Sequence, residues 1–356
     1  MKRPFPSRGA TRNTASQRFN LPAHEADGDW LDQSADIDGP PPPLRTTVAI
    51  ERPRTIIARN QSPDIGFDRS INPYRGCEHG CIYCFARPSH AWHDLSPGVD
   101  FESRLFAKPD AADLLKAELA HKSYQCAPIA FGTNTDPFQP IEAKWGISRQ
   151  CVAVLAECDH PLTITTKSDR VVELIDLIAP MAEKQLVSVA ISVTSLTSAI
   201  ARTLEPRAPR PEKRLAAIKA LADAGIPVWV SISPIIPAIT DHEMEHILEL
   251  AAGAGAKAAF FIPVRLPHEV APLFRAWLDQ HFPDRADRVM HIIQSLRGGR
   301  DNDPSFFSRM RGSGPWADLL RTRFRIASAR LGLNREKLKL RTDLFRPPQG
   351  AQLRLF

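Results

Sequence analysis

Short apolar strands alternate with amphipathic helices across residues 70–264, and this alternation constrains the fold more than any other feature. The expected strands are 71–74, 128–132, 161–166, 186–193, 227–233 and 258–264. Strands that read as apolar throughout and are separated by helical segments indicate a parallel sheet with right-handed crossovers. Six units fall short of the eight that close a barrel. We therefore expect an α/β fold, an open three-quarter (βα)6 TIM-like barrel.

Local signals also place several helix starts. Asp110 and Ser148 are expected to be N-caps, because their side chains can accept hydrogen bonds from the first free amides of a helix. Pro211 suits a first helical turn. Thr240 and Glu243 have the spacing of a capping box.

Composition divides the chain into three parts. Residues 1–60 are polar, contain a proline run and show little apolar periodicity, so we expect a poorly ordered N-terminal segment. Residues 61–285 are expected to form the partial barrel. Residues 286–356 form a basic C-terminal extension with an amphipathic helix over 316–331. We expect this extension to close the open side of the barrel or to line a substrate entrance.

Three cysteines follow the first expected strand in the spacing C-x3-C-x2-C: Cys77, Cys81 and Cys84. Three thiolates on one loop can ligate three irons of a cubane cluster and leave the fourth iron without a protein ligand. Gly76 and Gly80 allow the backbone to wrap closely around such a cluster. The loop follows the carboxyl end of a strand, where barrels of this kind carry their sites. We expect these three cysteines to ligate one [4Fe–4S] cluster.

The cysteine loop has two other interpretations. A structural zinc site would take its fourth ligand from His79, His90 or His93. Such a site usually draws on a second ligand pair, and the downstream sequence contains none. Disulfides are disfavoured, because the chain has six Cys in 356 residues and a basic N-terminus without an apolar signal sequence.

At this loop the sequence resembles the radical S-adenosylmethionine (SAM) superfamily, whose signature is three cysteines with an aromatic residue before the third. Tyr83 supplies that aromatic residue. The resemblance implies a radical SAM core with two cofactors, a [4Fe–4S] cluster and SAM, whose amino and carboxylate groups chelate the open iron. It further implies reductive cleavage of SAM to a 5′-deoxyadenosyl radical that abstracts hydrogen. An external one-electron donor of the flavodoxin or ferredoxin type is implied as a partner.

The resemblance also suggests SAM contacts at the other strand ends. Thr135 and Asp136 would hold the SAM amino group, with a simple turn before proline as the alternative. Lys167 would pair with the SAM carboxylate, with a surface lysine as the alternative. Ser192, favoured over Thr194 by strand alternation, would meet the ribose, or would be a buried hydroxyl bonded to backbone.

The strand ends are more closely similar to the spore photoproduct lyase-like, or "DNA repair photolyase"-like, branch of the superfamily. The similarity covers residues 71–264 and includes Thr166-Lys167, Leu204-Glu205-Pro206 and Lys213-Arg214. Glu205 would contact the SAM ribose or the substrate, with a local salt bridge as the alternative.

The lyases of this branch carry a hydrogen-donating cysteine near the end of the second strand. Residues 131–135 here read FGTNT and contain no thiol, so we do not expect thymine-dimer repair. The spare cysteines, Cys126, Cys151 and Cys158, are too scattered for a second cluster and are expected in the core.

A net charge of +6 and a pI near 9.1 are compatible with nucleic acid as a partner. No apolar run approaches the roughly 20 residues that span a bilayer. We therefore expect a cytoplasmic monomer without a membrane segment. Two hypotheses follow: a lyase- or oxidoreductase-like radical SAM enzyme whose unidentified substrate includes nucleic acid among the candidates, and a zinc-loop nucleic-acid-binding protein without catalysis.

Overall fold

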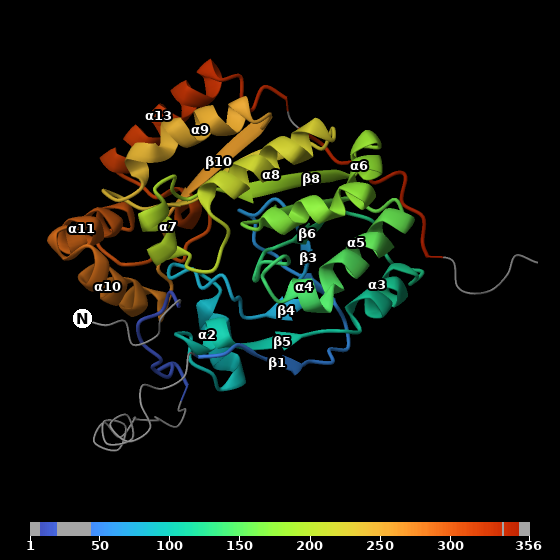
Figure 1. Ribbon diagram of the computed structural model, residues 1–356, viewed down its shortest axis with the longest axis horizontal. Coiled ribbons are helices and arrows are strands. Elements are labelled where there is room, and N and C mark those ends of the chain that lie inside the picture. The colour runs from blue at the N-terminus through green and yellow to red at the C-terminus, as the bar shows by residue number, and fades with distance from the viewer. Residues whose placement is uncertain (1–7, 20–43, 337, 349–356) are drawn as a thin grey trace, which may run out of the picture.

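The computed structural model describes residues 8–19, 44–336 and 338–348, and it has an α/β fold built on a seven-stranded sheet (Figure 1). In spatial order the strands are β10 (Ala258–Pro263), β9 (Val228–Ile235), β8 (Val187–Ser192), β7 (Leu162–Thr166), β6 (Ile129–Phe131), β3 (Arg69–Ile71) and β2 (Ile57–Arg59). The six strands from β3 to β10 are parallel, and β2 pairs antiparallel with β3. The predicted open barrel of six units is confirmed.

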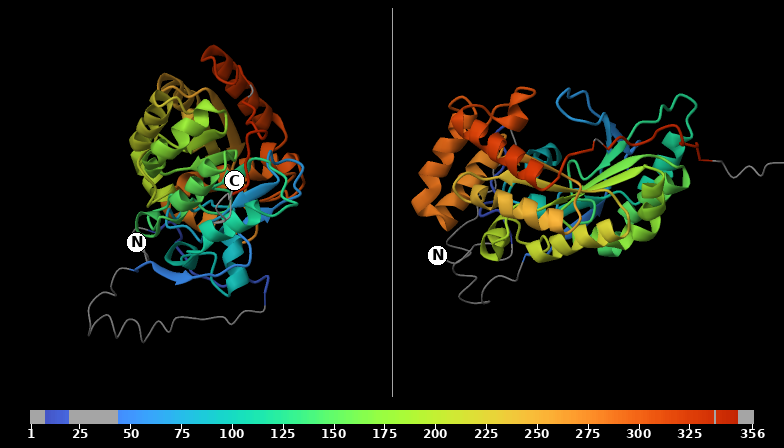
Figure 2. Two further views of the ribbon diagram at one scale, coloured as in Figure 1. Left: turned by 90° about the vertical axis from the view of Figure 1, so that its right-hand side faces the viewer. Right: turned by 90° about the horizontal axis from the view of Figure 1, so that it is seen from above.

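Helices between the strands cover one face of this sheet (Figures 1 and 2). They are α3 (Ala111–Leu119), α4 (Glu142–Trp145), α5 (Ile147–Glu157), α6 (Ile175–Glu183), α8 (Pro211–Asp223) and α9 (Met244–Gly253), with short 3₁₀ turns at η2 (Asp169–Leu174) and η3 (Asp241–Glu243). The helix α7 (Ser198–Leu204) follows β8 but packs against the cysteine loop. Val187, Val189 and Ile191 of β8 point into the core beneath these helices. Alternation places Ser192 on the opposite face of β8.

A second, three-stranded sheet stands beside the barrel. Its order is β1 (Thr47–Ile50), β5 (Arg104–Ala107) and β4 (Tyr74–Arg75), and it is accompanied by η1 (Arg87–His93) and α2 (Asp100–Ser103). The predicted single strand 71–74 is therefore wrong, because β3 ends at Ile71 and the chain passes into the small sheet at Tyr74. Pro73 lies between them and has no N–H with which to continue the first ladder.

Some predicted helix starts differ from the structure. Gly146, not Ser148, occupies the N-cap of α5, and the Ser148 hydroxyl donates to the Pro137 carbonyl at 2.6 Å. The capping box is also wrong: the Thr240 hydroxyl accepts from the Ile236 amide, and the Glu243 carboxylate is bound by Leu196 and Thr197. These polar groups serve tertiary contacts, which sequence spacing does not report. Pro211 opens α8 as predicted, and Asp110 holds the N-cap position of α3, but its carboxylate binds Arg52 and makes no capping hydrogen bond.

Part of the N-terminal segment is more ordered than expected. Residues 44–60 contain β1 and β2, and residues 8–19 make specific contacts with α2 and its surroundings. The expectation of poor order does not hold for these two stretches. Residues 1–7 and 20–43 lie outside the described residues.

After β10, the described residues form four helices and the turn η4 (Pro283–Arg285). The helices are α10 (Val270–His281), α11 (Ala286–Leu296), α12 (Ser308–Arg311) and α13 (Pro315–Arg330). Arg309 binds both carboxylate oxygens of Asp64, in the turn between β2 and β3, at 2.7 and 2.6 Å. Arg297 donates to the carbonyls of Pro263 and Val264, at the end of β10. The extension thus connects the two edges of the open sheet. Across the described part of the chain, no helix is both long and apolar enough to cross a membrane.

Candidate cofactor site

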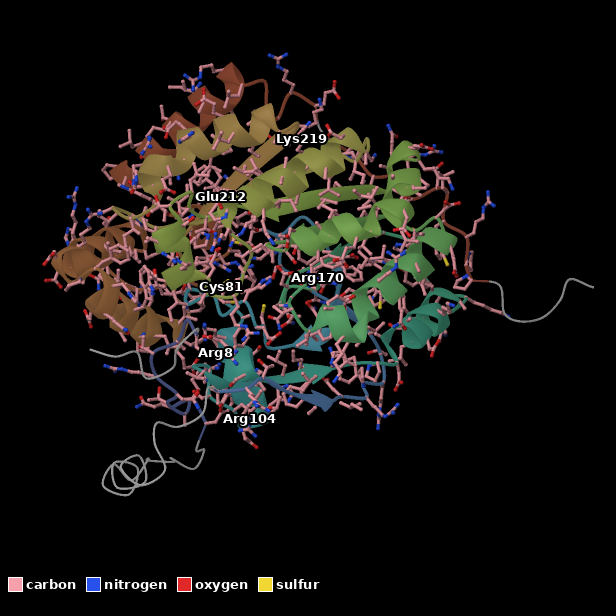
Figure 3. The ribbon with its side chains drawn as sticks, in the orientation of Figure 1. Arg8, Cys81, Arg104, Arg170, Glu212 and Lys219 are labelled. Carbon is pink, nitrogen blue, oxygen red and sulfur yellow. The ribbon has the colours of Figure 1, made fainter. Side chains whose placement is uncertain are left out.

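The cysteine loop lies inside the molecule, beyond the carboxyl end of β3 (Figure 3). Cys77 and Cys81 are each 7% exposed, Cys84 is half-buried, and all three are free thiols. The Cys77 amide donates to the Phe101 carbonyl at 2.9 Å, and the Ile82 amide donates to the Leu204 carbonyl at 3.0 Å. The loop is therefore held between α2 and α7.

Two glycines are required by the path of this loop. Gly76 has a φ of +70° and Gly80 a φ of +67°. A Cβ at position 76 would come within 2.5 Å of Leu105 Cδ2, and one at position 80 within 2.6 Å of Glu102 Oε2. A side chain at either place would push the loop away from its supports.

The chemistry of the donor set fits an iron–sulfur cluster. Thiolates are the usual ligands of such clusters, and three free thiols stand on one stretch of eight residues. Burial raises the pKa of Cys77 well above its usual range and that of Cys81 to about 12. Bound iron would displace these thiol protons.

Two of the histidines considered for a zinc site, His79 and His90, lie next to other polar groups. His79 Nδ1 lies 3.4 Å from the Asp136 carboxylate, and His90 Nε2 lies 2.8 Å from the Arg104 carbonyl. In the described ranges, no group of three or more His, Cys, Asp or Glu side chains is arranged to hold a metal ion.

Thr135 and Gln139 support the loop from the neighbouring strand end. The Thr135 hydroxyl donates to the Gly76 carbonyl at 2.9 Å, and Gln139 Nε2 donates to the same carbonyl at 3.2 Å. Gln139 Oε1 accepts from the Glu78 amide at 2.8 Å. Gln139 is fully buried and was not identified from the sequence, where one amide after a strand gives no signal.

Asp136 connects three segments of the site. Its carboxylate accepts hydrogen bonds from the Thr166 hydroxyl at 2.7 Å and from the amides of Lys167 and Phe138 at 2.8 and 2.9 Å. Burial would raise the pKa of Asp136, but nearby His79 and these hydrogen bonds hold that pKa at about 2. The carboxylate is therefore charged, and it fixes the loops after β6 and β7.

Lys167 lies immediately after β7 and points toward the cysteine loop. Its ammonium lies 5.8 Å from the centre of the Tyr83 ring, and it makes no hydrogen bond or ion pair with another described residue. Burial would lower the pKa of Lys167, but the nearby groups of Cys81 and Glu205 outweigh burial and raise it. A cation in this position is available to an anionic ligand.

Glu205 is the centre of a buried polar network. Its carboxylate accepts from the hydroxyls of Tyr83 and Thr194, the latter at 2.7 Å, and forms an ion pair with Arg214. Burial would raise the pKa of Glu205, but Arg214 and Lys167 hold it at about 2. Glu205 therefore forms a salt bridge, which was the alternative to a ligand contact, but its partner is Arg214, whereas the nearer Arg207 pairs with Glu78 at 2.9 Å. This network fixes the orientation of Tyr83 on the cysteine loop.

Ser192 ends β8 on the face opposite the helices, where it pairs in register with Ser231 of β9. Its hydroxyl makes no hydrogen bond with any other described residue, whereas the Thr194 hydroxyl is used by Glu205. Ser192 is therefore the freer of the two hydroxyls.

Arg87 supports the cysteine loop through hydrogen bonds to its backbone. This fully buried side chain donates to the carbonyls of Cys81 and Gly80 at 2.8 and 3.1 Å, and it pairs with Glu102 at 2.5 Å. The role of Glu102 was not predicted, because nothing in its local sequence marks it as buried.

Known proteins are similar to this chain in sequence and in fold. A model of the radical SAM superfamily matches residues 71–251, slightly more than half of the chain. An uncharacterized protein of Mycobacterium tuberculosis is 33% identical over 259 residues, covering 71% of this chain and 75% of that protein. An uncharacterized protein of Methanocaldococcus jannaschii is 28% identical over 217 residues, covering 60% of this chain and 76% of the relative.

Solved structures of spore photoproduct lyase share the fold. One of them, complexed with dinucleoside spore photoproduct, has a TM-score of 0.58 and 15% identity, covering 81% of both chains. A mutant form of that lyase has a TM-score of 0.57 and 15% identity, covering 88% of this chain and 86% of its own. The chain therefore belongs to the radical SAM superfamily of enzymes, and its fold is similar to that of spore photoproduct lyase.

Proposed function

We propose that this protein binds one [4Fe–4S] cluster through Cys77, Cys81 and Cys84 and uses it to cleave SAM reductively. The observation that supports the proposal is that three free thiols and the Lys167 ammonium lie at one end of a parallel sheet; this ammonium contacts the Tyr83 ring but forms no hydrogen bond or ion pair with another described residue. When bound, the cluster supplies the electron that breaks SAM into methionine and a 5′-deoxyadenosyl radical, which removes a hydrogen atom from the substrate.

The side chains around the loop would bind and orient SAM. Lys167 would receive its carboxylate and Ser192 its ribose, since both side chains lack hydrogen-bond partners among the described residues. Thr135 and Asp136 are proposed neighbours of the SAM amino group, and their bonds to Gly76 and Lys167 would also keep that wall of the site rigid. Glu205 would contact the SAM ribose, with the Tyr83 side chain next to it.

The substrate and the electron source are proposed only by class. An external donor of the flavodoxin or ferredoxin type would deliver the electron. Nucleic acid is a candidate substrate, supported by the net charge of +6 and by the dinucleoside bound to the structurally similar lyase. The zinc-loop hypothesis remains the alternative.

The test is anaerobic reconstitution with iron and sulfide, followed by incubation with dithionite and SAM and chromatography for 5′-deoxyadenosine. The wild type and Cys126→Ala should form it, because Cys126 lies before β6 and outside the loop. Cys81→Ala should not. A colourless, zinc-loaded wild type that forms no 5′-deoxyadenosine would favour the alternative.

A further inference from the structure

Residues 8–19, which we call the N-terminal strap, run beside α2 and the underside of the cysteine loop (Figures 1 and 3). The amides of Gly9 and Ala10 donate to the two carboxylate oxygens of Glu102, each at 2.8 Å. The Arg8 guanidinium donates to the Glu102 carbonyl at 2.6 Å. Three consecutive strap residues therefore bind one buried acid.

The same acid binds the cysteine loop through Arg87. Glu102 and Arg87 are both fully buried and form an ion pair at 2.5 Å. Arg87 in turn holds the carbonyls of Gly80 and Cys81. The strap is thus connected to the loop by a chain of two buried charges.

A buried carboxylate is costly unless all of its acceptor sites are satisfied. Arg87 donates to Glu102 Oε1, and the strap amides supply the hydrogen bonds to Oε1 and Oε2. Without the strap, Glu102 Oε2 would lose the hydrogen bond from the Gly9 amide, and the ion pair between Glu102 and Arg87 could rearrange. The strap thereby stabilises the charge that orders the loop.

The strap also touches the loop directly. A Cβ built on Gly9 would lie 1.8 Å from the Gly80 carbonyl oxygen, so the two backbones are in close contact at that point. Gly80 lies between Cys77 and Cys81. A side chain at position 9 would have to displace the loop segment that carries these thiols.

Further contacts anchor the rest of the strap. Ser96 donates to the Thr14 carbonyl at 2.6 Å. The Arg18 guanidinium pairs with Glu269, next to α10, at 2.7 Å and donates to the Pro88 carbonyl at 2.8 Å. These contacts hold the second half of the strap in place.

We propose that Arg8, Gly9 and Ala10 are positioning residues that act through Glu102 and Arg87 to hold Cys77 and Cys81 in the geometry a cluster needs. This inference rests on the proposed function, because it assigns the ordered loop a role in cluster binding. A substitution in the strap should therefore disturb the structure around Cys77 and Cys81 but not the packing of the barrel core.

The test compares full-length Gly9→Val with full-length Gly66→Val. Position 66 is the matched control, because a Cβ there meets no atom within 4 Å. In cluster-free protein under native conditions, the rates at which N-ethylmaleimide modifies Cys77, Cys81 and Cys151 are measured by mass spectrometry. Gly9→Val should speed modification of the two loop thiols about tenfold through local opening. Fully buried Cys151 should be unaffected, and Gly66→Val should match the wild type.

A second measurement uses the reconstituted protein. The low-temperature EPR spectrum of the reduced cluster should be one species in the wild type and a mixture in Gly9→Val. Glu102→Gln, which keeps the size of the side chain and removes its charge, should give the same mixture. If the strap only stabilised the fold, Gly9→Val would lower the amount of cluster bound without changing the EPR spectrum of the clusters that form.

Unchanged loop-thiol rates together with an unchanged spectrum would overturn the inference. An equal rise for Cys151 would also overturn it, because the strap would then be a general stability element. The thiol rates need neither cluster nor SAM. If they behave as predicted while the wild type fails to cleave SAM, the proposed function fails and the strap-to-loop coupling stands.

Discussion

The buried ion pair between Arg214 and Glu205 allows a sharp prediction about what supports Tyr83. Replacing Arg214 with Met keeps most of the side-chain volume in α8 but leaves Glu205 buried without its cationic partner. Arg214 is 1% exposed and Glu205 2% exposed, so water does not replace the lost contact. The Arg214 donors to the carbonyls of Ser192 and Pro209 are lost as well.

The expected cost follows from this burial. Removing one partner of a buried pair destabilises a protein by about 3–5 kcal/mol, because the other charge stays uncompensated. Lys219→Met on the same helix is the matched control: Lys219 pairs with Asp223 across side chains that are 66% and 62% exposed. Such a surface pair contributes about 0–1 kcal/mol. The two variants should therefore differ by about 3 kcal/mol in the free energy of unfolding.

Urea unfolding of the cluster-free protein, followed by circular dichroism, measures this difference. With a slope of about 3 kcal/mol per molar urea, the midpoint of Arg214→Met should fall about 1 M below that of Lys219→Met. The double variant Arg214→Met/Glu205→Gln should recover part of the loss, because the uncompensated charge is gone. Equal midpoints for the two single variants would refute the network, since Arg214 would then be as dispensable as a surface lysine.

Four further predictions concern the site and the core. Iron and sulfide analysis of reconstituted protein should give about four of each per chain, and doubled values would contradict a single cluster. Lys167→Ala should keep the brown colour of the cluster but weaken SAM binding in calorimetry by about 1.5–3 kcal/mol, as expected for a lost hydrogen bond to a charged group. If Lys167→Ala binds SAM as tightly as Lys219→Met does, Lys167 is only a surface lysine. Burial holds the pKa of His160 at about 4, so protonation favours the unfolded chain and stability is lost as pH falls from 6.5 through 4. This loss is about 3 kcal/mol, and His160→Gln should show a shallower decline in pH-dependent urea unfolding; an identical decline would contradict this assignment. Finally, anaerobic incubation with SAM and lesion-bearing DNA should yield 5′-deoxyadenosine without restored thymines, because the loop after β6 has no thiol to donate hydrogen. Restored thymines would show that another residue donates the hydrogen.

The barrel and the position of its cysteine loop could be predicted because both are local in sequence. The strands from β6 to β10 were each found within a few residues, since apolar runs such as 187–191 are long enough to be recognised without their partners. The cysteine spacing is likewise contained in eight residues. Of the spare cysteines, Cys151 and Cys158 lie in the core as predicted, but Cys126 is only partly buried, because it precedes β6 at the end of the strand away from the loop.

What was missed depends on partners that are distant in the chain. The small sheet joins Tyr74 to Ala107 and Thr47 to Arg104, and no window of sequence contains both members of either pair. Glu243 looked like a capping residue, yet it binds Leu196 and Thr197 from another loop.

The N-terminal strap was read as poorly ordered for a similar reason. Its sequence is polar and has no apolar periodicity, which in isolation predicts little structure. In the fold, the amides of Gly9 and Ala10 reach Glu102, more than 90 positions along the chain. The strap is ordered by its hydrogen bonds to the buried Glu102 carboxylate. The sequence does not show that Glu102 is buried, because its burial depends on how α2 and the cysteine loop pack.

The central claim is that the cysteine loop and the mouth of the barrel together hold a cluster whose open iron receives SAM. Low-temperature EPR of the dithionite-reduced protein, recorded with and without SAM, tests this claim most directly. We predict the spectrum of one [4Fe–4S] cluster whose g-values shift when SAM is added, and a smaller shift at equal SAM in Lys167→Ala. A wild-type spectrum that SAM leaves unchanged at saturating concentration would contradict the account.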